Sequence, residues 1–353
     1  MSSPAQQEIH RRRVFYIPGY DPIHPRRYRE LYRREGRAQA KISGYLLDLA
    51  GRRKRDGYGW RVSSIQDGAT VETEVDVLVW SDIVRVSMEH GIARTYWIMA
   101  RTAWIYLGTG TLARLMRLRK GPVIAALYPV GMLILQAVAG IFAGLLAALI
   151  VTWALGWLSR AFGIGAGLAA APWIAAVPLG ALACLAVFRH FKNVDNRLYV
   201  YYLMHDYAYS AATRGAYPPE LEARIADFVH RVEDALEEDV DEVLVVGHSS
   251  GAHLAVSVLA DLHRGGRIPT ALPRLAFLSL GQVVPMVSFL PDAHRLRGDL
   301  AYLSAADIPW VDVTAPGDGC AFALCDPVAV SGVAPVGKRW PLAVSYTHLT
   351  LPT

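Results

Sequence analysis

The stretch that decides the fold is Glu242-Val243-Leu244-Val245-Val246-Gly247-His248-Ser249-Ser250-Gly251, in the last third of a 353-residue chain. Its first five residues form a short apolar run of strand composition. The next nine residues, from Ala252 to Ala260, have helical spacing. An apolar strand, a Gly-x-Ser-x-Gly turn and a helix, in this order, are the context in which a nucleophile elbow is found.

The residues of this turn have expected physical roles. The serine of an elbow occupies a sharp turn with strained φ and ψ, and side chains at Gly247 and Gly251 would collide with the neighbouring strand and helix. The helix N-terminus behind Ser249 favours developing negative charge. We therefore expect Ser249 to be a nucleophile. The alternative is an ordinary strand–helix turn, in which the small residues serve packing only.

A second feature is the apolar block that covers residues 121–188. It is far too long for one buried core helix, and a membrane-spanning helix needs about 20 apolar residues. We expect two spans, the first within Pro122–Leu155 and the second within Gly165–Phe188, joined by a turn at Gly156–Gly165. The block is thus predicted to be an inserted transmembrane hairpin.

Basic residues predict how this hairpin is oriented. The turn carries Arg160 alone, whereas the flanks carry Arg114, Arg117, Arg119, Lys120, Arg189, Lys192 and Arg197. The positive-inside rule then places both flanking soluble segments in the cytoplasm. Residues 1–13 contain no apolar region of a signal peptide. We expect a multi-pass protein of the plasma (inner) membrane with the bilayer as a partner, and Thr95–Leu107, which mixes Trp, Tyr and Arg, as an interfacial helix.

Charge and cysteine content exclude several classes of protein. The formal net charge of +5 is modest, and a solvated or headgroup-facing surface explains it better than nucleic-acid binding. The cysteines, Cys184, Cys320 and Cys325, have no partner at metal-ligand spacing and agree with a reducing compartment. No zinc-finger, RNA-binding or phosphate-binding motif is present. We therefore expect no metal, no cofactor and no nucleic-acid partner; the oligomeric state is left open.

The soluble segments, residues 1–120 and 189–343, are expected to form one domain around the inserted hairpin. The strands predicted besides the one before the elbow are Val14–Tyr20, Trp60–Ile65, Asp76–Trp80, Leu198–Met204, Leu275–Leu280 and Trp310–Val313. Helices are predicted at Pro25–Ile42, Pro218–Leu236, from the elbow to about Leu262, and at Asp292–Ala305. Strands that alternate with helices favour an α/β fold with a mostly parallel sheet.

Three segments, in chain order, resemble the α/β-hydrolase superfamily. They are Val14–Tyr20, the elbow at Gly247–Gly251, and the strand with its Pro-Gly-Asp turn at Val313–Asp318. The resemblance covers the soluble portion and leaves out the hairpin. It implies an α/β-hydrolase-like fold in which Ser249 is the nucleophile.

The same resemblance implies further site residues. In the superfamily the oxyanion hole uses the backbone N–H after the nucleophile and one from the loop after an early strand, which here are Ser250 and either Gly19 or Tyr20. The acid follows a later strand, and Asp318 fits this place best. The runner-up for the acid is Asp326, and Asp312 is expected within the strand. An Asp in a Pro-Gly turn is also ordinary turn chemistry.

The histidine departs from the superfamily pattern, in which it follows the acid. After Asp318 the chain has His348 alone, within residues 344–353. This tail resembles the translation of a common sequencing adapter, provides no evident strand before the histidine, and is expected to be foreign to the protein. The competing interpretation makes His348 the catalytic base. The remaining histidines that we considered have structural or solvated interpretations: His205, His248, His253, His263 and His294.

These features together predict a membrane-anchored serine hydrolase of the esterase, lipase or thioesterase type. Its substrate is expected to be a small-molecule or lipid-like acyl compound, because the protein is attached to a membrane. One alternative is a non-catalytic membrane scaffold that keeps a hydrolase core for packing. Another is an acyltransferase, whose chemistry differs only in the acceptor.

Overall fold

The computed structural model of the chain describes residues 9–51, 57–162, 172–269, 273–315 and 317–345. The chain forms two compact units. The first unit contains Met1–Glu89, Trp104–Val123 and Tyr209–Thr353, and the second contains His90–Ala103 and Ile124–Ala208.

The first unit is built on an α/β sheet whose eight strands, within the described residues, have the order β2-β3-β4-β1-β5-β6-β7-β8. From β4 to β8 in this order all neighbours are parallel, whereas β2, β3 and β4 form an antiparallel meander at the other end. The strands are β1 (Arg11–Ile17), β2 (Leu46–Gly51), β3 (Tyr58–Gln66), β4 (Ala69–Val77), β5 (Glu242–His248), β6 (Arg274–Leu280), β7 (Trp310–Thr314) and β8 (Leu342–Ser345).

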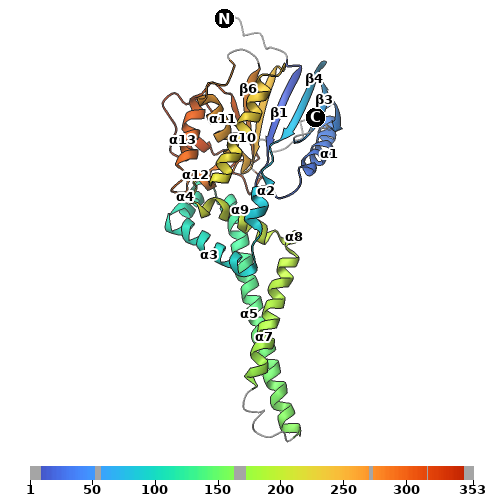
Figure 1. The fold of residues 1–353 in the computed structure, drawn as a ribbon, viewed down its shortest axis with the longest axis vertical. Helices are drawn as coiled ribbons and strands as arrows, with labels where there is room; N and C mark the ends of the chain where they lie inside the picture. Colours follow the sequence, from blue (N-terminus) through green and yellow to red (C-terminus); the bar gives the residue numbers. More distant parts are fainter. Residues whose placement is uncertain (1–8, 52–56, 163–171, 270–272, 316, 346–353) are drawn as a thin grey trace. The chain divides into compact units, whose positions relative to one another are not determined.

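Helices cover this sheet. The central one is α11 (Gly251–Arg264), which is buried along nearly its whole length because apolar residues occupy almost every side of it. It packs on β1, β5 and β6, with α10 (Pro219–Leu236) and α13 (His294–Ala305) beside it (Figure 1). At the antiparallel end, α1 (Arg26–Ser43) packs on β2 and β3. The shorter helices of this unit are α2 (Ser81–Met88), α4 (Thr111–Leu118), α12 (Val284–Ser288) and α14 (Pro327–Val330).

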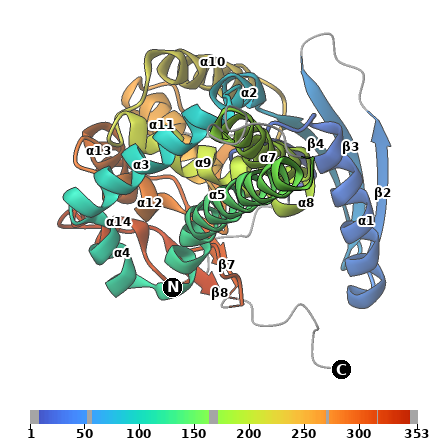
Figure 2. The same ribbon diagram turned by 90° about the horizontal axis from the view of Figure 1, so that it is seen from below.

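The second unit contains two long apolar helices, α5 (Lys120–Phe162) and α7 (Trp173–Asn193), which lie side by side (Figure 2). Both are long and apolar enough to cross a membrane, and few of their residues are buried within the protein. They approach most closely at glycines: a Cβ on Gly144 would lie 2.8 Å from the carbonyl oxygen of Gly180, and one on Gly180 would lie 2.7 Å from that of Gly144. Such contact between backbones requires the absence of side chains.

The segments that flank these helices in the second unit are also structured. They contain α8 (Asp195–Leu198) and most of α3 (Ile92–Gly108) and α9 (Val200–Ala212), two helices whose last residues belong to the first unit. A small apolar core forms where α3 and α9 meet α5, around Leu133, Val200, Tyr201 and Met204. This core holds the first turns of α3 against the helix pair.

The structure corrects several predicted elements. Leu198–Met204 is helical and not a strand, so His205 and Asp206 lie within α9 and do not follow a strand. Its aromatic and branched residues suit a strand locally, but here they pack against α5. The first apolar helix extends through Gly156 and Arg160 to Phe162, so the turn begins later than predicted.

Strand boundaries also differ from the prediction. β1 begins at Arg11 and ends at Ile17, and β4 ends at Val77, so residues 78–80 of the predicted strand Asp76–Trp80 are not strand. β2 was not predicted. A strand, β8, leads into the C-terminal tail, so the prediction that no strand precedes His348 is wrong. Residues 346–353, including His348, lie outside the described residues, as do Gly163, Gly165 and Pro316.

Candidate active site

The elbow has the backbone geometry expected of it. Ser249 follows β5 directly and has a φ of 54°, in the left-handed region that side chains rarely adopt. Its N–H donates to the carbonyl oxygen of Leu280 at 2.9 Å, and its own carbonyl accepts from Ala252 at 3.1 Å. A strained residue held from both sides in this way is typical of a functional turn.

The two glycines of the turn are required by close backbone contacts. A Cβ on Gly247 would lie 2.7 Å from the Cα of Ala252 in α11. A Cβ on Gly251 would overlap the carbonyl oxygen of Ile17 and lie 2.5 Å from that of Pro18. The predicted collisions with the neighbouring helix and strand are therefore confirmed, and the two glycines allow α11 and the end of β1 to pack closely around the turn.

The loop after β1 meets the elbow. A Cβ on Gly19 would lie 3.0 Å from the Cβ of Ser249 and 3.4 Å from its Oγ. Ser250, at the N-cap of α11, is nearly buried. In the described part of the chain, neither the Ser249 hydroxyl nor the Ser250 N–H is used in a hydrogen bond. The structure thus brings Gly19, Ser249 and Ser250 together at the carboxyl end of the sheet.

Two contacts that the sequence did not predict hold this loop. The indole N–H of Trp80 donates to the carbonyl oxygen of Pro18 at 2.9 Å, and the hydroxyls of Tyr20 and Ser87 are hydrogen-bonded at 2.5 Å. Trp80 and Tyr20 are both buried. The sequence predicts Trp80 at the end of a strand and indicates no partner for its side chain. The contacts tie the Gly19–Tyr20 backbone to α2 and restrict its movement.

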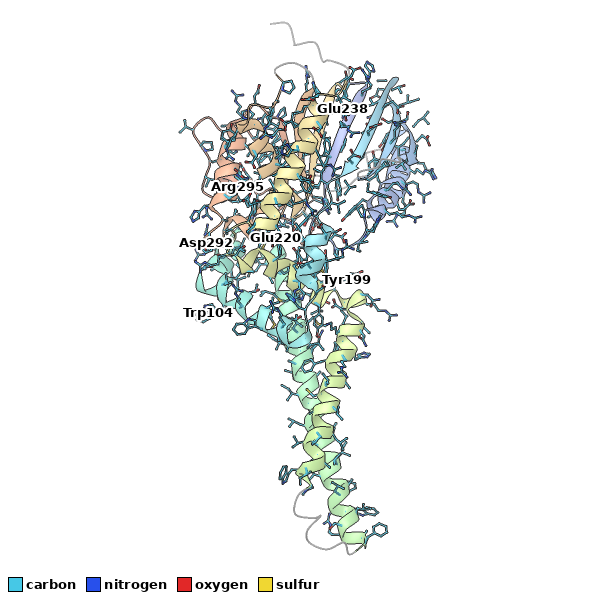
Figure 3. The ribbon with its side chains drawn as sticks, viewed as in Figure 1. Trp104, Tyr199, Glu220, Glu238, Asp292 and Arg295 are labelled. Atoms are coloured by element: carbon cyan, nitrogen blue, oxygen red, sulfur yellow. The ribbon has the colours of Figure 1, made fainter. Side chains whose placement is uncertain are left out.

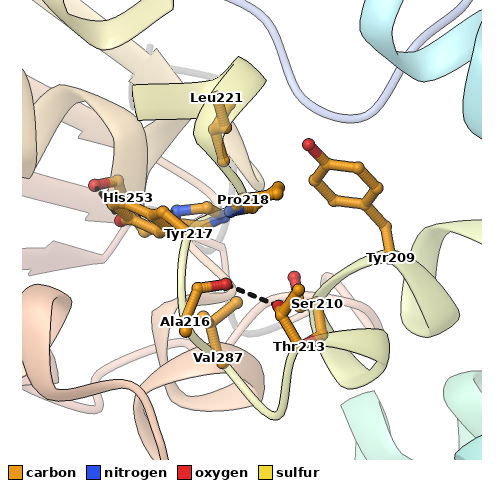
Figure 4. Close-up of a pocket in the computed structure, with 10 residues that line it drawn as sticks. Tyr209, Ser210, Thr213, Ala216, Tyr217, Pro218, Leu221, His253 and Val287 are labelled. Carbon is orange, nitrogen blue, oxygen red and sulfur yellow. Dashed lines mark hydrogen bonds between the residues drawn. The ribbon is translucent and has the colours of Figure 1, made fainter. Parts of the chain in front are cut away.

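An aromatic cluster continues from this loop. The rings of Tyr20, Trp80 and Tyr209 lie with centroids 5.9 to 6.3 Å apart. Tyr209 also lines a small cavity with Tyr217 and His253 (Figure 4). The space for solvent in this cavity is about 10 Å³, which suits about one water molecule. The cavity is therefore too small to hold an acyl substrate.

The three candidate acids have distinct surroundings. Asp318 follows β7, and its Oδ1 accepts hydrogen bonds from the N–H groups of Cys320 at 2.8 Å and Ala321 at 3.3 Å. Its Oδ2 lies 3.4 Å from where a Cβ on Gly281, after β6, would stand. The carboxylate is thus anchored through one oxygen at the same end of the sheet as the elbow.

The other two carboxylates have structural roles. Asp326 caps α14 by accepting from Val328 and Ala329, and it pairs with Lys338 at 2.5 Å. Asp312 lies within β7, as predicted, and is fully buried. Its Oδ1 accepts from the Ser279 hydroxyl at 2.5 Å, and burial raises its pKa to about 6.

The two histidines closest to Ser249 in the chain, His248 and His253, contact tyrosine side chains. The His248 ring stacks on Tyr16 with centroids 6.3 Å apart. Desolvation lowers the pKa of His248, although part of the residue stays exposed, and the Asp318 and Asp21 carboxylates oppose this shift. His253 is buried in α11 beside the Tyr217 hydroxyl at 3.1 Å, and burial lowers its pKa to about 3. A neutral, enclosed imidazole of this kind serves packing.

Among the described residues, no histidine is hydrogen-bonded to Ser249, and no group of three His, Cys, Asp or Glu side chains is placed to hold a metal ion. His348 lies three residues beyond β8, outside the described residues. The described site therefore provides a strained serine, backbone donors and an anchored carboxylate. This arrangement can bind an oxyanion next to a hydroxyl nucleophile, and it needs a base to complete it.

Comparisons with protein-family models, with curated proteins and with solved structures found no match. The chain's own geometry is consequently the basis of any functional assignment. That geometry is a mostly parallel α/β sheet with a strained serine at its carboxyl edge, together with two apolar helices of membrane-spanning length.

Proposed function

We propose that this chain is a membrane-anchored serine hydrolase of the α/β-hydrolase type that acts on an ester or thioester. The observation that carries the proposal is the φ of 54° at Ser249, between β5 and α11. Backbone strain at a serine is costly by roughly 1–3 kcal/mol and persists where it serves a function. The close packing of Gly247 and Gly251 supports the same interpretation.

The proposed reaction follows from the neighbours of the serine. The Ser249 hydroxyl attacks the acyl carbonyl while a histidine takes its proton, and the leaving group departs with that proton. The N–H of Ser250 and one from Gly19 or Tyr20 hold the oxyanion, each donor contributing about 3–4 kcal/mol in comparable sites. Asp318 orients the histidine. Water then hydrolyses the acyl-enzyme.

His348 is one candidate for the base, on its position in the chain. In the superfamily pattern the base follows the acid and the last strand, and His348 stands in this place, three residues after β8. The adapter-like character of residues 344–353 supports the opposite view, that His348 is not the base. Esterase activity of the chain and its His348→Ala variant separates the two: loss of a substantial activity assigns the base to His348.

The two apolar helices support a proposal for the class of substrate. With α5 and α7 spanning the bilayer and basic flanks on the cytoplasmic side, the hydrolase unit would act at the inner face of the plasma membrane. A lipid-like acyl compound is the substrate class that such a location favours.

A second candidate is a non-catalytic membrane scaffold that keeps the hydrolase core. The observation in its favour is that, in the described part of the chain, Ser249 has no histidine partner. Transfer of the acyl group to an acceptor other than water uses the same residues and remains a variant of the first proposal.

The test is hydrolysis of p-nitrophenyl esters and acyl thioesters of several chain lengths. Ser249→Ala should reduce activity by at least about 1,000-fold, and Asp318→Asn by at least about tenfold. Asp326→Asn is the matched control, because its carboxylate caps α14, and it should keep most of the activity. A chain with no activity above that of Ser249→Ala would favour the scaffold.

A further inference from the structure

One face of α3 is exposed in a pattern that the hydrolase site does not explain. Ala93, Arg94, Trp97, Ala100, Arg101 and Trp104 recur at intervals of three and four residues, all exposed. Trp97 is 67% exposed and Trp104 is 78% exposed. Figure 3 shows Trp104 on the outside of its helix. Tryptophan and arginine alternating along one exposed face are typical of a helix in a membrane interface.

Contacts within the second unit show how far along α5 and α7 the start of α3 lies. The Tyr96 ring packs on Phe188 of α7 with centroids 5.6 Å apart, and its hydroxyl donates to the carbonyl oxygen of Leu133 in α5 at 2.8 Å. Lys192 donates to the carbonyl oxygen of His90 at 3.1 Å. The start of α3 is therefore level with the last turn of α7.

That turn is where a spanning helix would leave the hydrocarbon. α7 is apolar up to Phe188, and its exposed basic residues begin at Arg189. At about 1.5 Å per residue, α5 is about 65 Å long, twice the roughly 30 Å of a hydrocarbon core, so only part of it can be immersed. The closely packed part is the segment around Gly140 and Gly144 that faces α7.

Charged side chains at this end of the unit are mostly basic. Its exposed basic residues are Arg94, Arg101, Arg189, Lys192 and Arg197. The carboxylates that the unit contains are Asp195 and Asp206, and Asp195 is used as a cap by the N–H groups of Val200 and Tyr201. A surface of this composition is complementary to anionic headgroups, with each basic side chain near an anionic surface contributing about 1 kcal/mol.

We infer that the exposed face of α3 lies in the headgroup layer of the bilayer and contacts anionic lipid through its arginines. Trp97 sits at the boundary between headgroups and acyl chains, where its ring is partly buried and its N–H group stays hydrated. The inference rests on the membrane hairpin of the proposed function, but not on the chemistry of Ser249. It identifies α3 as the element that fixes the depth of the helix pair.

The test uses the full chain with Cys184→Ala, Cys320→Ser and Cys325→Ser, reconstituted into vesicles. A fluorescent NBD label is attached at Ala100→Cys on the exposed face of α3, or at Phe142→Cys on the lipid-facing side of α5. Doxyl groups at a shallow or a deep position on the acyl chain quench the label. We expect Ala100→Cys to be quenched at least about twofold more by the shallow group, and Phe142→Cys by the deep one.

The two positions separate the possible failures. If Phe142→Cys is quenched and Ala100→Cys is not, the hairpin stands and the inference for α3 is wrong. If neither is quenched, the membrane hairpin itself fails.

Vesicles of different lipid composition test the proposed contact between the arginines of α3 and anionic headgroups. Quenching at Ala100→Cys should be at least about twofold stronger in vesicles containing phosphatidylglycerol than in pure phosphatidylcholine, and 0.5 M salt should reduce the difference. Equal quenching in both lipids would overturn the contact with anionic headgroups. Arg94→Gln should weaken the preference for phosphatidylglycerol, whereas Arg160→Gln, at the other end of α5, should not.

Discussion

The backbone of Gly19 lies against the side chain of Ser249: a Cβ added to Gly19 would stand 3.0 Å from the Cβ of the serine and 3.4 Å from its Oγ. This contact joins the loop after the first strand to the elbow, although 230 residues separate the two in the chain. It puts the Gly19–Tyr20 backbone next to the serine, where the proposed reaction requires a second oxyanion donor.

Replacing Gly19 by alanine should therefore impair catalysis more than stability. The added methyl group pushes the loop or the serine by a few tenths of an ångström, and a displaced donor costs about 10- to 100-fold in rate. Steady-state esterase assays and thermal melts check this. Gly298→Ala is the control, because no atom lies within 4 Å of its Cβ position. Equal activity in both variants would show that the contact has no catalytic role.

The close packing of α5 against α7 should depend on the glycines at their contact. Gly144→Leu forces a side chain into the carbonyl oxygen of Gly180 and should separate α5 from α7, lowering the melting temperature in detergent and exposing Cys184 to thiol reagents. Gly156→Leu, on the same helix with open space around it, should behave like the wild type. Identical melting of the two variants would contradict the close packing of the pair.

Membrane topology gives a third prediction. Single cysteines at Asp67 and Asp239, in a chain without its native cysteines, should be labelled from the cytoplasmic side of sealed vesicles. A cysteine at Ala161, near the end of α5, should be labelled from the other side. The reason is the excess of Arg and Lys on the two flanks of the hairpin. Labelling of Asp67→Cys and Asp239→Cys from opposite faces would mean a single span.

Asp312 should make stability depend on pH. Burial raises its folded-state pKa to about 6, above an unfolded value of about 3.9, so the native state binds the proton more tightly. Its contribution to stability is fully present below pH 4 and is lost as the pH rises through 6. Asp312→Asn keeps an acceptor for Ser279 and removes the buried charge, so it should be more stable at pH 7.5, by up to about 3 kcal/mol, and little changed at pH 4.

The measurement is the melting temperature of both proteins between pH 4 and 8. Parallel profiles would show that Asp312 does not titrate in this range. Asp307→Asn serves as the control, because the Asp307 side chain is almost fully exposed to solvent.

The elbow and the apolar block were predictable because each depends on local sequence. An apolar strand, two glycines and a helix define the turn around Ser249 without long-range information, and span length follows from hydropathy. The segment from Leu198 to Met204 was mispredicted because Tyr, Val and Leu suit a strand locally. Only the core around Leu133 makes it helical.

Long-range contacts account for the rest of the site. Nothing in the sequence indicates that the Trp80 indole binds the carbonyl of Pro18, or that Asp326 caps a short helix while Asp318 faces the loop after β6. β8 was missed because Leu342–Ser345 is short and becomes a strand by pairing with β7 at the edge of the sheet. Such pairing depends on the register of distant residues.

The most direct test of the account is covalent labelling of the intact, reconstituted chain with a fluorophosphonate, followed by mass spectrometry of the modified peptide. Ser249 alone should carry the phosphonyl group, Ser249→Ala should abolish labelling, and Ser250→Ala should keep most of it, because the change leaves its backbone N–H in place. Equal labelling of the wild type and Ser249→Ala, or modification at another serine, would contradict the assignment of Ser249 as the nucleophile.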